Sequence, residues 1–326
     1  MDASIPVTLK KKSALRTLLS QWELMLMSIP LLLYKILFSY VPLTGWATAF
    51  MDFKVRPPNP DLGMFSQLYE QLFSHKWIGF QKFEFLLKSE HFRRVVRNTV
   101  SQSFLTLVLG FVCAITLALL MNEIRSLGFK RVFQNISYLP HFLSWIIVVG
   151  LVGDALAVEN GIINEILLTL KLVNEPIFFL GDPNKFWGIV AFSHLWKSLG
   201  WNTIIYMAAI TAIDTTLYEA AGIDGANRYG KMWHITLPGI RPTIIILLIM
   251  NIGYLMQAGF EIQYFLGTGP TVEMAETIDI YVLKYGLRGG DFALGTAAGI
   301  FKSVISITLI AIANFLAGRF GEEKLI

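Results

Sequence analysis

Charged residues are scarce in this sequence. Asp, Glu, Lys and Arg together make up 15% of the 326 residues, whereas 54% are hydrophobic. Soluble domains have about 25% charged residues, so a chain this apolar cannot easily cover its own surface with polar groups. The apolar residues also occur in long blocks, and blocks of about 18 or more are candidates for membrane-spanning helices. The sequence therefore indicates an integral membrane protein.

Cysteine is almost absent as well. Cys113 is alone within an apolar block, so it can form neither an internal disulfide nor a multi-cysteine metal site, and we interpret it as a small buried residue. Basic runs interleaved with aromatic residues are also missing, so nucleic-acid binding has no support. A membrane-bound enzyme would need a catalytic cluster, but the histidines are scattered along the chain, at His75, His91, His141, His194 and His234.

The apolar blocks predict an all-α membrane protein with six transmembrane helices. Each block has about 20 to 25 residues, which is enough to cross a hydrocarbon core of roughly 30 Å. Membrane β-strands alternate and run only about ten residues, so a barrel is excluded. The first block is too long for a signal-peptide core, and we expect it to be retained. The predicted spans are 22–44, 97–121, 135–154, 187–211, 243–266 and 293–317.

The distribution of Lys and Arg predicts that both termini are cytoplasmic, because short cytoplasmic loops carry an excess of these residues. The predicted cytoplasmic side holds Lys10, Lys11, Lys12, Arg16, Arg125, Lys130, Arg131, Arg228, Lys231, Arg241, Arg319 and Lys324, whereas the opposite short loops hold Lys171, Lys185, Lys284 and Arg288. Arg93, Arg94 and Arg97 argue against this orientation, but they belong to a long loop, where the rule is weaker.

The chain is thus divided into five predicted parts. Residues 1–21 form a cytoplasmic segment and 22–44 the first membrane helix. An outer loop, 45–96, includes an amphipathic helix from Phe83 to Arg97, and 97–317 form a transport core of five membrane helices with a long loop at 214–242. Residues 318–326 form a cytoplasmic tail. Pro30 and Pro140 lie inside predicted spans and could kink them.

The loop 214–242 has the features of two short helices joined by a turn. Asp214 can cap the first helix, around Leu217 to Ala221. Gly225 permits a backbone conformation that residues with a Cβ resist. A second helix, Ala226 to His234, is expected to end before Leu237-Pro238. Without further information, this loop could be only a stiff connector between two spans.

The spacing of residues within this loop resembles a known motif. Glu-Ala-Ala, three residues, Gly, nine residues, Ile, one residue and Leu-Pro form the cytoplasmic loop motif of permease subunits in binding-protein-dependent ABC importers. Its positions are occupied here by Glu219, Ala220, Ala221, Gly225, Ile235, Leu237 and Pro238, with Asp224 beside the glycine. The segments Phe92–Thr99 and Thr277–Asn314, and Tyr40-Val41-Pro42-Leu43, resemble the carbohydrate and polysaccharide branch of that family.

The resemblance implies a channel-forming subunit without a catalytic site or cofactor of its own. A separate ATPase would hold ATP and Mg, and the loop would dock into it, with Glu219 making polar contacts and Gly225 setting the turn. The implied partners are a second, related permease in a heterodimer, two ATPase subunits and an extracytoplasmic substrate-binding protein. The implied location is the bacterial inner membrane, and the implied substrate is an oligosaccharide or polysaccharide, alginate among the candidates.

Polar residues inside the predicted spans are costly and therefore need an explanation. In the fourth span, His194, Lys197 and Trp201 share a helix face. In the fifth, Asn251, Tyr254, Ala258 and Glu261 do so, with Gln257 beside them. Lys302 lies in the sixth. These residues either line a pathway for a hydrophilic substrate or pair with one another, for example Glu261 with Lys197 or Lys302. As a sharper hypothesis, Lys197 and Lys302 guide a polyanionic sugar.

One alternative to the importer remains open on the sequence. A gradient-driven secondary transporter would need no ATPase partner, but it predicts internal repeats, which are not evident. Gly225 to Lys231 also fits most of a phosphate-binding loop. The next residue is Met232, where a Ser or Thr should hold magnesium, and no strand is predicted before the glycine. We therefore expect no ATP binding by this chain.

Overall fold

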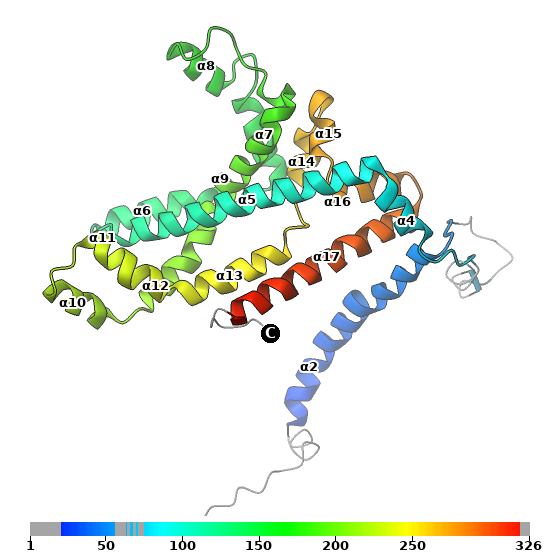
Figure 1. Cartoon of the computed structure of the whole chain (residues 1–326), viewed down its shortest axis with the longest axis horizontal. Helices are drawn as coiled ribbons and strands as arrows, with labels where there is room; N and C mark the ends of the chain where they lie inside the picture. Colours follow the sequence, from blue (N-terminus) through cyan, green and yellow to red (C-terminus); the bar gives the residue numbers. More distant parts are fainter. Residues whose placement is uncertain (1–20, 56–62, 64–65, 68–69, 71–74, 320–326) are drawn as a thin grey trace, which may run out of the picture.

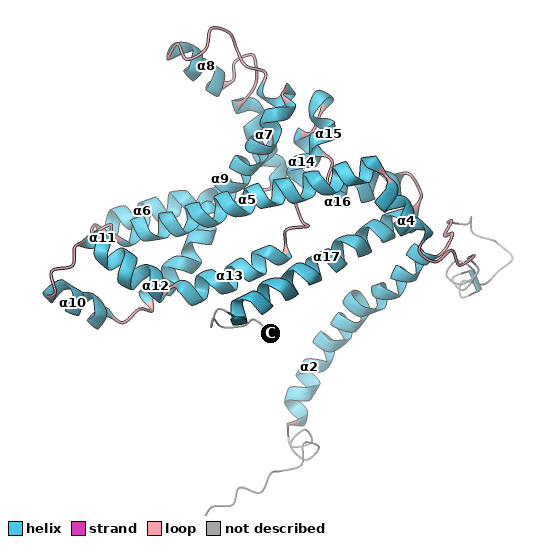
Figure 2. Ribbon diagram, in the orientation of Figure 1, coloured by secondary structure: helices cyan, strands magenta, loops and turns pink. Residues whose placement is uncertain are grey.

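The computed structural model describes residues 21–55, 63, 66–67, 70 and 75–319, and these are helical apart from loops and a single antiparallel bridge between Met51 and Trp77. Several long helices lie roughly along the longest axis, a shorter group projects to one side, and the first helix diverges from the rest (Figure 1). Figure 2 shows no strand arrows in the described chain. Nearly all of the predicted end segments, 1–21 and 318–326, lie outside the described residues.

The first helical run extends from Trp22 to Phe50, as α2 Trp22–Lys35, the π-helix η1 Ile36–Tyr40 and the 3₁₀-helix η2 Val41–Phe50. It confirms the predicted helix at 22–44, passes through Pro30 without a break, and continues six residues beyond the predicted end. Only its last part packs on the bundle, where Thr48 Oγ1 donates to Thr296 Oγ1 at 3.1 Å.

The predicted amphipathic helix from Phe83 to Arg97 is divided in the structure. The helix α4 Gln81–Lys88 ends at Ser89, and the 33-residue α5 Glu90–Asn122 begins immediately afterwards. Ser89 causes the division, because its extended backbone ends α4 while its hydroxyl accepts from Phe92 N at 3.2 Å and caps α5. The prediction of one surface helix is therefore wrong for Glu90 to Arg97, which belong to a long span.

The third predicted span, 135–154, is bent rather than straight. The helices α6 Leu127–Tyr138 and η3 Leu139–Phe142 meet α7 Trp145–Ala155 at an angle of 103°. Pro140 removes a backbone donor at the second residue of η3, and Ser144 caps the new helix by accepting from Ile147 N at 3.4 Å. We call this bend, residues 139–145, the knee. The chain continues outward to α8 Ile162–Thr169 and η4 Phe179–Gly181.

The fourth predicted span is one continuous helix, α9 Pro183–Thr211, and it packs along α5. The contact is formed by small and aliphatic residues, since Ala114 and Ala118 of α5 are almost fully buried against α9. The other buried members of this cluster are Met121, Tyr206, Met207, Ile210 and Ile240. Small side chains allow two helices to approach closely within a membrane.

The loop after α9 is helical for longer than expected. It contains α10 Thr215–Ile223, α11 Arg228–Lys231, the π-helix η5 Met232–Thr236 and α12 Leu237–Gly239. The prediction that the second helix ends before Leu237-Pro238 is wrong. In the π-turn that precedes Pro238, backbone hydrogen bonds run to the fifth residue, so the missing proline N–H breaks no regular four-residue ladder.

The fifth predicted span, 243–266, is interrupted. The helix α13 Arg241–Gly253 meets the preceding helix at 57° and ends at Gly253, and a non-helical stretch leads to α14 Glu261–Leu266. Gly259 lies in this stretch with φ +80°, a conformation that residues with a Cβ rarely adopt. Further short elements follow, namely η6 Gly269–Thr271, α15 Val272–Ala275, α16 Ile278–Tyr281 and η7 Val282–Arg288.

The last helix, α17 Phe292–Arg319, confirms the sixth predicted helix. By length and composition, three described helices can cross a membrane: Trp22–Phe50, Glu90–Asn122 and Phe292–Arg319. The count rises to five if each bent pair is one span. The helix α9 has 29 residues but is not among them. The fold is thus an all-helical membrane protein with three to five candidate spans.

Candidate functional site

Two parts of the structure carry functional features, and the first is the loop between α9 and α13. Asp214 caps α10 as the sequence predicts, because its Oδ1 accepts from Thr216 N at 2.9 Å. This hydrogen bond favours the carboxylate and holds the pKa of Asp214 below its usual value. The cap fixes where the first helix of the loop begins, at Thr215, four residues after the end of α9.

The turn of the loop is built on Gly225. Its φ is +78°, and an added Cβ would meet no atom within 4 Å, so glycine is required for the backbone conformation and not for space. Ala226 N closes the turn by donating to Ala221 O at 2.9 Å, and Asn227 Oδ1 then accepts from Gly230 N at 2.8 Å. A helix precedes this glycine rather than the strand that a phosphate-binding loop needs.

The motif residues divide between the surface and the interior of the loop. Glu219, Ala220, Asp224, Gly225 and Pro238 are exposed, whereas Ala221, Ile235 and Leu237 are half-buried. The two helices are joined where the hydroxyls of Tyr218 and Thr236 lie 3.0 Å apart. The loop, which we call the knob, is therefore held together by this contact and exposes its acidic residues Glu219 and Asp224.

The loop also exposes large apolar residues that the motif does not include. Ile223 is 88% exposed, and Tyr229 and Trp233 are also largely exposed. Large apolar side chains gathered on one small knob are typical of a surface that another protein covers. The motif spacing does not single out these three residues, because none of them occupies a motif position.

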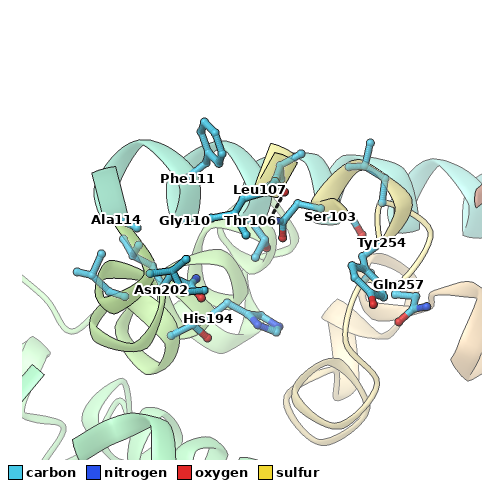
Figure 3. Close-up of a pocket in the computed structure, with 18 of the residues that line it drawn as sticks. Ser103, Thr106, Leu107, Gly110, Phe111, Ala114, His194, Asn202, Tyr254 and Gln257 are labelled. Atoms are coloured by element: carbon cyan, nitrogen blue, oxygen red, sulfur yellow. Dashed lines mark hydrogen bonds between the residues drawn. The ribbon is translucent and has the colours of Figure 1, made fainter. Parts of the chain in front are cut away.

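The second part is a cavity of about 240 Å³ between α5, α9, α13 and the non-helical stretch after Gly253 (Figure 3). None of its lining residues is Asp, Glu, Lys or Arg. Its polar lining residues are Ser103, Thr106, His194, Ser198, Asn202, Tyr206, Asn251, Tyr254 and Gln257. The wall is thus rich in hydroxyls and amides but carries no permanent charge.

Three polar atoms at this cavity have no hydrogen-bond partner among the described residues. They are the Ser103 and Thr106 hydroxyls of α5 and Nε2 of His194 on α9, and all three are buried. Buried polar atoms nearly always have a partner, from the protein, from water or from a ligand. An added Cβ on Gly259 would lie 2.9 Å from His194 Nε2, so this glycine also leaves room for the ring. The cavity is therefore suited to a hydroxyl-rich ligand.

The structure places half of the predicted pathway residues at this cavity. His194, Asn251, Tyr254 and Gln257 line it. The reason given for the last three was wrong, because α13 ends at Gly253 and they do not share a helix face with Glu261. The interruption itself brings Tyr254 and Gln257 to the wall. Ser103, Thr106 and Asn202 were missed, although Ser103 and Thr106 are spaced one helical turn apart in an apolar span.

The other four predicted residues lie elsewhere. Lys302 pairs with Asp279 at 2.5 Å, and neither it nor Lys197 lines the cavity. The ammonium of Lys197 instead contacts backbone carbonyls of the knee, and the Trp201 ring stacks on His141 with centroids 4.5 Å apart. Glu261 begins α14 and does not line the cavity. The role of these residues in a substrate pathway remains a prediction.

Three comparisons with known proteins bear on this arrangement. A family profile described as "Binding-protein-dependent transport system inner membrane component" matches residues 107–322. The polygalacturonan/rhamnogalacturonan transport system permease protein YteP of Bacillus subtilis (strain 168) is 41% identical over 323 residues, which cover 99% of this chain and 96% of YteP.

Two solved structures are similar over nearly the whole chain. One is a bacterial ABC transporter involved in the import of the acidic polysaccharide alginate, with a TM-score of 0.82 at 36% identity over 94% of this chain and 99% of that chain. The other is the alginate ABC transporter with an alginate pentasaccharide-bound periplasmic protein, with a TM-score of 0.84 at 35% identity over 96% and 100%. The chain belongs to the inner-membrane permease components of binding-protein-dependent ABC importers, in which the ATPase is a separate subunit.

Proposed function

We propose that this chain forms one half of the pore of an importer for acidic oligosaccharides. YteP is named for the transport of polygalacturonan and rhamnogalacturonan, and the solved transporter for the import of the acidic polysaccharide alginate. Both are similar to this chain over almost its full length. The observation that carries the proposal is the cavity, where buried hydroxyls and a histidine nitrogen lack partners that sugar hydroxyls could supply. Alginate and polygalacturonate fragments are the two substrates to test.

The proposed topology has six spans with both termini in the cytoplasm. The two bent pairs each count as one span, and α9 is the sixth, since it is long enough to cross a bilayer even with its polar residues. The excess of Lys and Arg in the loops around residues 125–131 and 228–241 supports this orientation. The loop 214–242 is then on the cytoplasmic face, and α8 is on the outer face.

In this topology the loop couples the pore to the ATPase. Its knob would dock into a cleft on one ATPase subunit, with Glu219 making polar contacts, Ile223 entering an apolar pocket and Gly225 maintaining the turn. The support is the match of all seven motif positions together with the exposure of the knob. ATP and Mg would be held by the ATPase, so that this chain transmits motion without binding a cofactor.

The complete importer would contain this chain, a second and related permease, two ATPase subunits and an extracytoplasmic binding protein. The binding protein would deliver sugar to the outer side, and the cavity would accept it when the pore opens outward. Closure of the ATPases would shift the loop and, through α9, move one wall of the cavity. Access to the sugar would thereby alternate between the two faces of the membrane.

The test uses this chain assembled in lipid with the second permease, the ATPase subunits and the binding protein. ATP hydrolysis is measured with the binding protein loaded by oligogalacturonate, alginate oligomers or neutral oligosaccharides. The loop variant is Gly225→Val, because a β-branched residue resists φ +78°. The control is Gly128→Val, since Gly128 is also exposed with open space around it but lacks a positive φ.

The expected result is stimulation by a uronate oligomer in the wild type and the control, and loss of stimulation in Gly225→Val. Stimulation by neutral sugars alone would retain the importer and reject an acidic substrate. Full stimulation in Gly225→Val would reject the coupling role of the loop.

A further inference from the structure

Lys197 is a buried cation of α9 whose partners are all on the knee. Its Nζ donates to the carbonyls of His141 and Leu143, each at 2.6 Å, and lies 3.5 Å from that of Pro140. It is also 5.4 Å from the centre of the Trp145 ring. These four residues span the point where η3 ends and α7 begins.

The carbonyls explain why a lysine is suitable at this place. The last carbonyls of a helix have no donor from the helix itself and carry a negative partial charge. At the 103° bend the Pro140 carbonyl still accepts from Leu143 N at 3.2 Å, but within the described residues no backbone N–H reaches the carbonyls of His141 and Leu143. An ammonium has three donors and a positive charge, so it can satisfy several of these carbonyls at once. Within the described part of the chain, the ammonium bonds to these carbonyls and to no carboxylate.

Two neighbours of Lys197 on α9 hold the knee on either side of it. The ring of His194 packs against Trp145 at the start of α7, with centroids 4.4 Å apart. The ring of Trp201 stacks on His141 of η3, with an interplanar angle of 4°. We call His194, Lys197 and Trp201 the knee clamp. The sequence had placed these three on one helix face, and the structure shows what that face contacts.

The knee clamp is directly connected to the cavity. His194 belongs to both, because its ring lies against Trp145 while its Nε2 is a partnerless atom at the cavity wall. Ser198 and Asn202, which also line the cavity, follow on the same helix. Gly200 lets α6, the helix before the knee, approach α9 closely, since an added Cβ would lie 2.2 Å from Ser137 O. A shift of α9 relative to the knee would therefore displace the cavity wall.

We propose that Lys197 is a positioning residue for transport. It fixes the knee against α9, so that α6 and α7, on the two sides of the knee, move as one unit with the cavity wall. The inference deepens the proposed function and rests on it for the meaning of the cavity. It also removes Lys197 from direct recognition of the substrate, because its ammonium is directed at backbone carbonyls and is not at the cavity wall. The charge of a uronate would then be balanced elsewhere, for example on the partner permease.

The first experiment measures the knee directly and needs no substrate. In a Cys113→Ala background, spin labels are placed at Ile147 of α7 and Phe192 of α9, both of which are exposed. Pulsed electron resonance on the complex in lipid then gives the distribution of distances between them. Lys197→Met should broaden or shift this distribution, whereas Lys197→Arg should restore a narrow one, because its guanidinium can still donate to the carbonyls.

The matched control is Lys185→Met, since Lys185 lies on the same helix and pairs with Asp182 at an exposed site away from the knee. Its distribution should equal that of the wild type. If Lys197→Met does not assemble, Trp201→Leu removes the stack on His141 and the edge contact with Phe142, both on the knee, and should also broaden the distribution. A native distribution in Lys197→Met, or in Trp201→Leu where that variant replaces it, would overturn the proposal.

The second experiment separates positioning from substrate recognition. Lys197→Met should reduce the maximal import of acidic and neutral oligosaccharides alike, by about tenfold, as expected when carbonyls lose a charged donor. The concentration for half-maximal import should stay unchanged. A selective loss of acidic substrate would show that Lys197 binds the anion, and the inference would be wrong. If the wild type imports neither sugar, the proposed function fails, but the distance measurement still tests the clamp.

Discussion

At the scale of single residues, Asp214 shows how local chemistry sets the position of the loop. Its carboxylate accepts from Thr216 N at the first turn of α10. Because this hydrogen bond lowers the folded-state pKa of Asp214, it contributes stability above the ordinary aspartate pKa of about 3.9. That contribution is lost as the pH falls through the lowered folded-state value.

The first prediction is that α10 frays at low pH in the wild type. Between pH 5 and pH 3, the amides of residues 215–218 should lose protection from hydrogen exchange, after correction for the intrinsic rates. Asp214→Asn keeps an acceptor at every pH and should not show this loss. Equal loss in both proteins would mean that the carboxylate does not control the start of the helix.

The second prediction concerns Thr106, whose buried hydroxyl has no partner in the cavity. Thr106→Val removes an unsatisfied polar group, so the thermal stability of the substrate-free complex should stay equal or rise. If a sugar hydroxyl pairs with it, the variant should need about fivefold more substrate for half-maximal import, from a bond worth about 1 kcal/mol. Thr116→Val, on the exposed face of α5, is the control. Unchanged import would remove Thr106 from the pathway.

At the scale of elements, the segment Phe92–Thr99 near the start of α5 is bonded to residues 273–278, which lead into α16. Asn98 Nδ2 donates to the carbonyls of Glu273 and Glu276, at 2.6 and 3.1 Å, and Thr99 Oγ1 accepts from Ile278 N at 3.0 Å. Phe92 completes the contact by packing edge-on against Tyr281. The residues that resemble a family motif in the sequence therefore form a joint in the fold.

The third prediction follows from this joint. Asn98→Ala leaves two carbonyls without donors in a fully buried place, which should cost about 1–3 kcal/mol. The measurement is the midpoint of thermal unfolding of the purified complex in detergent. Asn135→Ala, at an exposed position of α6, should leave that midpoint unchanged. If Asn98→Ala unfolds at the wild-type midpoint, water must replace the hydrogen bonds of the side chain without a loss of stability.

The elements differ in how well the sequence predicts them, and the reason is whether the cause is local. Asp214 and Gly225 act on their own backbone, so the start and turn of the loop could be predicted. The end of α13 at Gly253 could not, because hydropathy continues through the interruption to residue 266. The contacts of the Lys197 ammonium depend on a bend about fifty residues earlier in the chain, which the spacing of residues on one helix does not reveal.

At the scale of the whole molecule, α9 links the two functional parts. It carries cavity residues and the knee clamp along its length, and it ends three residues before the knob. The core that holds it against α5 includes Ile240, which precedes α13 at the other end of the loop. A force applied to the knob would thus reach the cavity through one helix and its buried contacts.

The fourth prediction tests how the knob transmits that force. Ile223 is 88% exposed in this chain, and in the importer we expect the ATPase to cover it. Burying an isoleucine side chain is worth about 1.5–3 kcal/mol, so Ile223→Ser should weaken binding of the purified ATPase by at least about tenfold. Val158→Ser, an exposed residue beyond the far end of α7, is the control and should bind normally.

Both outcomes of that measurement discriminate between mechanisms. Weaker binding with substrate-stimulated hydrolysis recovered at high ATPase concentration would show that Ile223 supplies affinity, while the capped and braced loop transmits the motion. Normal binding with lost stimulation would assign transmission to Ile223 itself. If both binding and stimulation are unchanged, the ATPase does not cover this face of the knob. The polar side of α10 around Glu219 would then be the remaining candidate for the contact.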